Sequence, residues 1–464
     1  MLTKRLAEFV INTQAVPTPA MSAAADALID TVGVALAGTL EESSEIVQRW
    51  IQETAAKPVV TLWGTHLRSS AADAAFANGI ASHALDFDDS LPTLRGHPST
   101  TLAPAVFAAA EASGATGKAT LEAFSIGVEI AGILGKAVGA GHYVRGWHTT
   151  STIGVFSATA AAARLFGLTV KQLQNAWGIA ASETSGLVCN FGTMTKPFHA
   201  GHAARSAVVA ATLARAGFTA NPDVFDGKES FFHTYAGDDA QKLEDLVKDL
   251  GKQWQILEPG IYVKRWPCCY CNHRALGGLQ LMVAEHGLQL DDIQTVQVGF
   301  LPGSDNALVS EDPQTGLSGK FSIEYCVAAL LIDGKVTLDS FTDAMVQRSE
   351  IRKVMKKVHR VRIEAKGLFS GVVGYTDLTV VTSKGEFKKR VDNVPGSPEW
   401  PMTKTDRADK FFDSAGRVLG LKGATQLFEA LNECATFNEL REIIKLTVPD
   451  TVNPKQPTEK RVSV

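Results

Sequence analysis

The sequence contains few cysteines and no long uninterrupted run of apolar residues. Six cysteines are spread over 464 residues, and no stretch of about 18 consecutive apolar residues occurs. These two absences argue against a disulfide-dense secreted scaffold and against a membrane-spanning helix. The N-terminal segment also lacks the continuous apolar core of a signal peptide. We therefore expect a cytoplasmic protein with its thiols reduced.

The chain also lacks a strong excess of charge of either sign. Its 45 Lys and Arg residues nearly balance 49 Asp and Glu residues, which gives a formal net charge of -4. Such a balance does not supply the broad basic surface that non-specific nucleic-acid or anionic-membrane binding requires. We expect neither nucleic acid nor membrane as a partner. A hydrophobic content of 45% is ordinary for a globular chain with a sizeable core.

Hydrophobic periodicity divides the chain into helical and mixed parts. Ala-rich patterns predict helices at about 99–113, 117–138, 151–167, 170–184 and 196–217. Strands are predicted at 295–302, 359–365 and 377–392, the last as a hairpin that turns at Lys384-Gly385. The predicted fold is mainly α with a smaller α+β domain. Residues 1–263 and 399–464 would form an all-helical domain, and residues 264–398 an α+β domain.

A highly charged loop separates two apolar helical segments at residues 83–99, HALDFDDSLPTLRGHPS. It holds three aspartates, two histidines and an arginine within 17 residues. Charges between buried helices are costly unless they are paired, solvated or used. The alternative is a solvated surface loop with a capping Asp. We favour a functional loop, because two later stretches have the same architecture.

Three basic side chains each stand beside a predicted helix start: His97, His148 and Lys196. The free N–H groups and dipole of a helix start favour an anion. Any one of them, taken alone, could be a capping neighbour or a solvated side chain without another role. Together they predict a pocket that binds a carboxylate-rich ligand and moves its protons. Tyr143 and Arg145 lie shortly before His148 and are further binding or acid–base candidates.

The segment 264–274, KRWPCCYCNHR, carries the densest cysteine cluster of the chain. Its Cys-x-x-Cys spacing suggests zinc, a redox pair or a cysteine nucleophile, but no second Cys/His pair lies at zinc-finger distance. We favour buried, inert thiols. Lys264 and Arg265 are candidate anion clamps, and His273 is a candidate proton-transfer group. His199 and His202 share a helix face, yet no HExxH-like glutamate accompanies them, so no metal site is predicted.

Five separated motifs resemble the MmgE/PrpD family, whose members include 2-methylcitrate dehydratase, cis-aconitate decarboxylase and iminodisuccinate epimerase. The motifs are HALDFDD…HPS, GWHTTSTIG, TKPFHAGHAARS, KRWPCCYCNH and FSIEYCVAALLIDG. The resemblance extends from about residue 5 to about residue 445. It implies an all-helical domain built from N- and C-terminal segments, an α+β lid domain, a homodimer and no required cofactor.

The resemblance also implies which residues form the substrate pocket. By motif these are Asp86, Ser90, His97, His148, Lys196, His273 and Tyr325. Tyr325 is assigned on the resemblance alone, because a tyrosine in an apolar helix is usually a core residue. Two features depart from the decarboxylase-like pattern. Ser90 stands where that pattern has threonine, and the spacing from Asp86 to His97 is one residue longer.

The predicted chemistry is proton transfer at a carbon next to a carboxylate of a small di- to tetracarboxylate. His148 or His273 would be the base, while Lys196 and Arg145 would hold carboxylates. His97 and Tyr143 are candidates for a second acid. The preferred reaction is epimerisation of iminodisuccinate. The alternatives are a 2-methylcitrate-dehydratase-type or cis-aconitate-decarboxylase-type lyase and, in a different class, a non-catalytic carboxylate-binding protein.

Overall fold

The computed structural model describes residues 1–236, 243–367, 369, 371 and 373–450. Contacts within the chain divide it into two units. Within the described residues, unit 1 comprises residues from 1–187, 194–261 and 404–450, and unit 2 comprises residues from 188–193 and 262–403. Residues 188–193, which the sequence analysis grouped with the helical domain, thus belong to unit 2. The end of the predicted helical domain, 451–464, lies outside the described residues.

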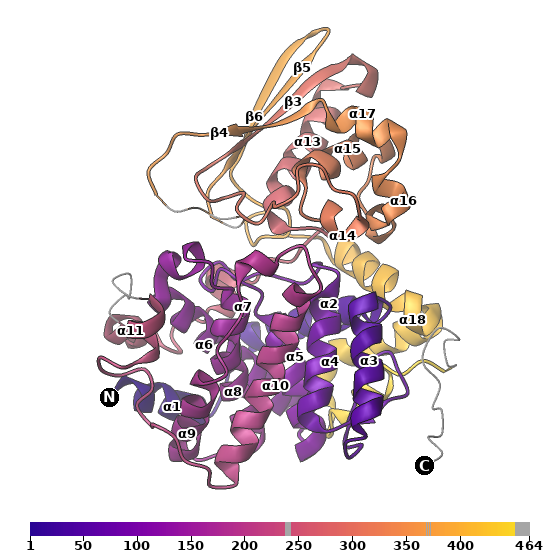
Figure 1. The fold of residues 1–464 in the computed structure, drawn as a ribbon. Coiled ribbons are helices and arrows are strands. Elements are labelled where there is room, and N and C mark those ends of the chain that lie inside the picture. The colour runs from indigo at the N-terminus through magenta and orange to yellow at the C-terminus, as the bar shows by residue number, and fades with distance from the viewer. Residues whose placement is uncertain (237–242, 368, 370, 372, 451–464) are drawn as a thin grey trace. The chain divides into compact units, whose positions relative to one another are not determined.

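Unit 1 is built from helices (Figure 1). Its described residues also include one small antiparallel pair of strands. The strands are β1 (Val60–Thr61) and β2 (Arg68–Ser69). The α-helices of unit 1 before residue 262 are α1 (Leu2–Asn12), α2 (Thr18–Gly38), α3 (Glu42–Thr54), α4 (Ala71–Ala84), α5 (Ser99–Ser113), α6 (Gly117–Val144), α7 (Thr149–Thr152), α8 (Gly154–Leu165), α9 (Val170–Ala181), α10 (Thr195–Arg215), α11 (Phe231–Ala236) and α12 (Leu243–Leu246). The C-terminal segment adds α18 (Lys404–Asn432) and α19 (Arg441–Lys445).

Small side chains allow the helices of unit 1 to be buried on most faces. Helices α2 and α6 are long and apolar enough to cross a membrane by length and composition alone. However, 72% and 89% of their most apolar windows are buried within the fold, which accounts for that composition. The helix predicted at 151–167 is two helices, the end of α7 and the whole of α8, which are separated at Ile153.

Helices α4 and α10 cross at a pair of glycines. A Cβ on Gly79 would lie 2.7 Å from the Cα of Gly201, and a Cβ on Gly201 would lie 2.4 Å from the carbonyl oxygen of Phe76. No side chain separates the two backbones at this point, so the helices approach as closely as their main chains permit. The crossing fixes the carboxyl end of α4 relative to the amino end of α10, where the charged loop and Lys196 lie.

The C-terminal segment completes unit 1 by packing α18 against α2. A Cβ on Gly33 of α2 would lie 2.7 Å from the ring of Phe411, which shows how closely that ring covers the helix. N- and C-terminal segments therefore share one helical core, as predicted. Segments that are far apart in the sequence lie side by side here, coloured indigo and yellow in Figure 1.

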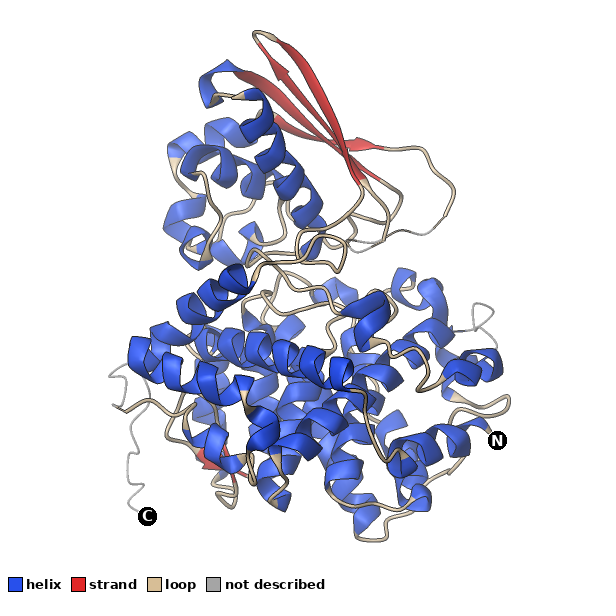
Figure 2. Ribbon diagram, turned by 180° about the vertical axis from the view of Figure 1, so that it is seen from behind, coloured by secondary structure: helices blue, strands red, loops and turns tan. Residues whose placement is uncertain are grey.

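Unit 2 contains a four-stranded sheet in the order β4-β3-β5-β6, with helices on one side (Figure 2). Its strands are β3 (Ile293–Phe300), β4 (Val358–Arg362), β5 (Thr376–Thr382) and β6 (Gly385–Val391). Strand β3 is parallel to β4 and antiparallel to β5. The hairpin between β5 and β6 turns at Ser383 and Lys384, next to the predicted position.

The helices of unit 2 are α13 (His273–His286), α14 (Gly316–Gly319), α15 (Ile323–Asp333), α16 (Asp343–Val346) and α17 (Ser349–Met355). Helix α13 packs closely on the sheet at Gly278, where a Cβ would lie 2.4 Å from Val391 and 2.6 Å from Leu378. Alternate residues of β5 are buried, as expected for a strand covered on one face. The predicted fold class, mainly α with a smaller α+β domain, is confirmed.

Candidate active site

The charged loop at residues 83–99 is buried, and each of its three aspartates has its own partners. Asp86 is 3% exposed, while Asp88 and Asp89 are not exposed at all. Asp86 pairs with Lys196, Asp88 with two histidines, and Asp89 with Ser99. This pairing is the condition under which buried charges are tolerated. The alternative of a solvated surface loop is therefore wrong.

Close backbone contacts hold the loop against α7. A Cβ on Gly96 would lie 2.8 Å from the hydroxyl of Thr149. That hydroxyl donates to the carbonyl of Arg95 (2.7 Å), and the backbone N–H of His97 donates to Thr150 Oγ1 (3.1 Å). Asp86 and Arg95 adopt left-handed backbone conformations, with φ of 52° and 53°. Such conformations cost about 1–3 kcal/mol each and persist where the surroundings impose them.

Lys196 forms a buried ion pair with Asp86 through Nζ and Oδ1. Helix α10 begins at Thr195, so Lys196 lies within its first turn. Lys196 is only 4% exposed. Removing one member of such a pair leaves a buried charge uncompensated and typically costs about 3–5 kcal/mol of stability.

Asp88 holds two imidazoles. Its Oδ1 lies 2.8 Å from His83 Nδ1, and its Oδ2 lies 3.1 Å from His97 Nδ1. The same nitrogen of His97 lies 2.7 Å from the carbonyl oxygen of Asp89 and 3.5 Å from Ser90 Oγ. Carbonyl and carboxylate oxygens accept hydrogen bonds, so the proton of each neutral ring belongs on Nδ1. Burial lowers the pKa of His83, so the His83 ring is neutral and keeps Nε2 as a basic nitrogen.

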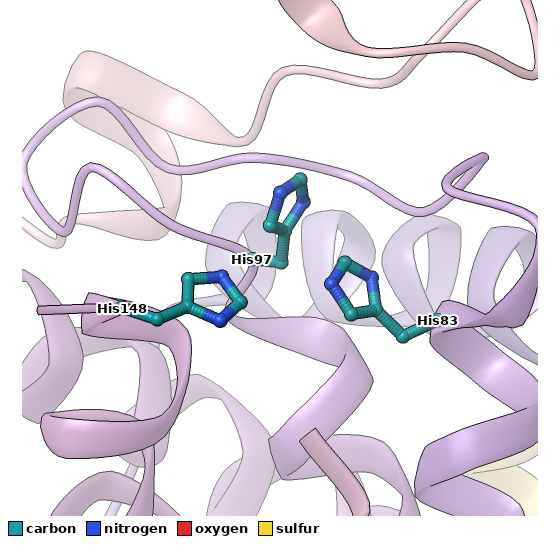
Figure 3. Close-up of side chains that lie close together, drawn as sticks. All are labelled: His83, His97 and His148. Carbon is teal, nitrogen blue, oxygen red and sulfur yellow. The ribbon is translucent and has the colours of Figure 1, made fainter. Parts of the chain in front are cut away.

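His148 and His199 form a second pair of imidazoles, with 3.0 Å between their Nδ1 atoms. His148 immediately precedes α7, and its backbone N–H donates to the carbonyl of Gly186 (3.0 Å). Figure 3 shows the rings of His83, His97 and His148 gathered from three separate segments. Their centroids are 4.7 Å apart for His83 and His97, and 6.0 Å apart for His83 and His148.

Burial keeps His83, His148 and His199 neutral near pH 7. It lowers the pKa of His83 and of His199 to about 4, and it lowers the pKa of His148 well below its usual value. The positive charge of Lys196 acts in the same direction on all three rings. A neutral imidazole accepts a proton, so this cluster provides bases next to one fixed cation.

The other side of the loop is acidic. Asp89 accepts a hydrogen bond from the hydroxyl of Ser99, the first residue of α5, and burial raises the pKa of Asp89 to about 8. Lys410 from α18 pairs with Asp30 (2.7 Å) and donates to the carbonyl of Phe87 (2.9 Å). Burial lowers the pKa of Lys410, while Asp30 raises it.

Five residues that lie in the histidine cluster or against the loop were not predicted as site residues from the sequence. They are His83, Asp88, Asp89, His199 and Lys410. Four of them lie within the quoted motifs, and the density of charge in residues 83–99 was the available signal. His199 was considered only as a metal ligand together with His202. The structure separates the two, because His202 stacks on Phe198 and its Nε2 lies 3.2 Å from the carbonyl of Glu183.

Tyr143 and Arg145 lie near the end of α6 and just beyond it. Arg145 is exposed, and its Nη2 donates to the carbonyls of Tyr235 (2.9 Å) and Ala236 (2.8 Å). These bonds anchor α11 to the end of α6. Tyr143 is half-buried in the last turn of α6. The binding role predicted for Arg145 and the acid role predicted for Tyr143 stay predictions.

The remaining candidates belong to unit 2 and are mostly buried there. Lys264 and His273 are fully buried, and His273 Nε2 lies 3.3 Å from the carbonyl of Cys268. Arg265 lies over the ring of Trp266, 5.7 Å from its centroid. The hydroxyl of Tyr325 donates to the carbonyl of Ser340, and burial raises its pKa. The roles predicted for these four residues stay predictions.

All six cysteines are free thiols. Within the described residues, two groups have the ligand types and spacing to hold a metal ion: His83, His97 and His148, and His83, Asp86 and Asp88. In each group the ligand atoms lie within 4.8 Å of one another. The Cys268–Cys271 segment forms no such group among the described residues.

Comparison with known proteins identifies the family. Residues 4–244 match the MmgE/PrpD N-terminal domain, and residues 266–434 match the MmgE/PrpD C-terminal domain. Human cis-aconitate decarboxylase is 28% identical over 430 residues, which is 89% of this chain and 88% of that protein. The mouse enzyme is 26% identical (89% and 87%), and the cis-aconitate decarboxylase-like protein oryM of Aspergillus oryzae is 27% identical (93% of each). With both domains matched in order, the chain belongs to the MmgE/PrpD family.

Proposed function

We propose that the protein is a lyase that acts on a small polycarboxylate and moves a proton at a carbon next to a carboxylate. The observation that carries this proposal is the cluster of buried, neutral imidazoles beside Lys196. A scaffold or a simple carboxylate-binding protein would need the positive charge of Lys196 but not the neutral histidines close to it. The human and mouse relatives reported above are named as cis-aconitate decarboxylases, which are lyases. Their names favour the lyase alternative over epimerisation, the reaction preferred from the sequence.

The proposed chemistry assigns separate tasks to the two types of group. Lys196 binds a substrate carboxylate and offsets the negative charge that develops next to it. A neutral imidazole accepts the carbon-bound proton, or returns one after it has been protonated. Burial excludes water and strengthens the effect of the single cation.

Decarboxylation of cis-aconitate is the first reaction to test, because the relatives named above match nearly the full length of the chain. Dehydration of a hydroxylated tricarboxylate such as 2-methylcitrate is the second candidate. The neutral state of His83, His148 and His199 favours it, since dehydration begins with removal of a proton by a base. Epimerisation of iminodisuccinate uses the same first step and stays a prediction, as do the homodimer, the cytoplasmic location and the lack of a required cofactor.

The test is incubation with cis-aconitate, 2-methylcitrate and iminodisuccinate, each in D2O and each followed by NMR. Release of CO2 with deuterium in the product supports decarboxylation, and a new alkene from 2-methylcitrate supports dehydration. Deuterium incorporation into iminodisuccinate without net loss would support epimerisation instead. Tight binding of a tricarboxylate with neither turnover nor exchange would favour a carboxylate-binding protein and overturn the lyase proposal.

A further inference from the structure

We propose that His83, oriented by Asp88, is the proton carrier of this site. The inference rests on the proposed lyase function and names the group that accepts or returns the substrate proton. His83 lies in the last turn of α4 and is 1% exposed. It was not among the residues that the sequence motifs assigned to the pocket.

Asp88 imposes one tautomer on the His83 ring. His83 Nδ1 lies 2.8 Å from Asp88 Oδ1, so the ring proton is held on Nδ1 and the lone pair is left on Nε2. A carboxylate behind an imidazole also stabilises the imidazolium that forms when Nε2 takes up a proton. Asp88 is fully buried, which strengthens this effect.

Nε2 of His83 is the atom that would exchange the proton with the substrate. This nitrogen of His83 is buried and has no hydrogen-bond partner among the described residues. In Figure 3 it points toward the space beside His148 and below His97. Buried polar atoms normally find partners, and those that do not are found where a ligand or a reaction requires them.

His142 provides the contrast within the same unit. It is as deeply buried as His83, and burial likewise lowers its pKa to about 4. However, its Nδ1 lies 3.1 Å from the carbonyl of Tyr235, and its Nε2 lies 2.8 Å from the hydroxyl of Thr152. Both nitrogens of His142 are thus used in the fold, whereas His83 keeps one for chemistry.

Charged and titratable groups from three segments surround His83. Asp86, Asp88 and His97 come from the loop, His148 from the segment before α7, and Lys196 from α10. In dehydration, Nε2 accepts the proton as the substrate C–H bond breaks, and the electron pair of that bond forms the C=C bond while the C–O bond breaks and the hydroxyl takes up a proton and leaves as water. In decarboxylation, the C–C bond to the leaving carboxylate breaks, CO2 departs, and the electron pair left on carbon takes the proton from protonated Nε2.

The test compares His83→Asn with His142→Asn. The asparagine side chain at position 83 can still donate to Asp88 but has no basic nitrogen in place of Nε2. We expect kcat to fall about 100-fold or more, with KM within about threefold of wild type, because general acid–base groups contribute factors of this size. Asp88→Asn should lower kcat less and shift the pH profile of kcat, since it removes the orienting charge. His142→Asn should lower the melting temperature and leave kcat within about threefold.

A kcat for His83→Asn within threefold of wild type, in a protein that melts cooperatively, would overturn the proposal. If that variant does not fold, the proposal is tested by the tautomer of His83 in the wild-type protein. ¹⁵N NMR of histidine-labelled protein measures this tautomer. A protonated Nδ1 with a bare Nε2 supports the proposal, and a protonated Nε2 overturns it.

Loss of activity on chelation that zinc restores would also overturn the proposal, because Nε2 of His83 would then be a metal ligand. Failure of wild type to convert any carboxylate would refute the lyase proposal, and the tautomer would still be measurable.

Discussion

Two buried lysine–aspartate pairs contact the same loop, and they differ in what surrounds them. Lys196 of α10 pairs with Asp86, and Lys410 of α18 pairs with Asp30. Both lysines are almost fully buried. Lys410 also contacts the loop directly, because its Nζ donates to the carbonyl of Phe87 and lies 4.0 Å from the centroid of the Phe87 ring.

The surroundings assign the two pairs different tasks. Lys196 faces imidazoles, and its charge adds to the effect of burial in lowering the pKa of His83, His148 and His199. Lys410 faces the carboxyl groups of Asp30, Asp88 and Asp89. The loop thus separates a basic side from an acidic side, and Asp88 contributes to both. We infer that the basic side performs the chemistry while the acidic side holds the loop in place.

Replacing each lysine with methionine should give the largest difference between the two pairs. Lys196→Met should lower kcat/KM at least about 1000-fold, because the cation that binds and stabilises carboxylate is lost. Lys410→Met should keep kcat/KM within about tenfold. Both variants should lose about 3–5 kcal/mol of stability, because each leaves a buried carboxylate without its partner. Urea unfolding and steady-state kinetics measure the two effects.

The double variant Asp86→Asn/Lys196→Met is the control for this comparison. Removing both charges should recover most of the stability lost in Lys196→Met, since no uncompensated charge remains, while activity stays low. Equal losses of activity in Lys196→Met and Lys410→Met would contradict the division of the loop into a chemical and a structural side.

The crossing of α4 and α10 allows a smaller, more selective perturbation. Gly201→Ala places a methyl group against the backbone at Phe76 and should cost about 1–3 kcal/mol. It should also lower activity, because it displaces α10 and with it Lys196. Gly416→Ala in α18 is the matched control, since a Cβ there meets nothing within 4 Å. That substitution should be neutral or add up to about 1 kcal/mol, from improved helix propensity. Melting curves that rank the two variants in the opposite order would refute the close crossing.

The fold could be predicted from the sequence because its signals are local. Helical periodicity, alternating strands and the Lys384-Gly385 turn each act over a few residues. The helix after His148 was predicted less well, since the structure ends α7 at Thr152 and begins α8 at Gly154.

The site could be predicted only in part, because its partners depend on the path of the loop. Charge density identified residues 83–99, but the pairing of His83 with Asp88 needs the left-handed turn at Asp86. Lys410 lies more than 300 residues away in a charged helix, and nothing in its own segment indicates that it reaches Phe87. Contacts between residues far apart in the sequence, such as Lys410 and Phe87, produce no local periodic pattern from which they could be predicted.

The pH dependence of stability offers the finest test of the two sides, because they respond in opposite directions. His83 and His199 have a pKa of about 4 in the fold and 6.5 when unfolded, so the unfolded chain binds more protons between these values. Stability on their account falls as the pH drops from 6.5 to 4. Asp89 has a pKa of about 8 in the fold against an ordinary 3.8. The folded chain therefore keeps a proton on Asp89 that the unfolded chain has lost. The contribution of Asp89 to stability falls as the pH rises toward 8.

Asp89→Asn should isolate the acidic side, because asparagine resembles the protonated acid and does not titrate. Between pH 6.5 and 8 the wild-type free energy of unfolding should decline by up to about 1.4 kcal/mol per pH unit relative to the variant. Below pH 6 the variant should keep the decline that the histidines cause. Urea titrations of both proteins at several pH values measure the difference. Parallel curves from pH 6.5 to 8 would show that Asp89 is ionised in the fold, and the acidic side would then carry one more negative charge for Lys410 to balance.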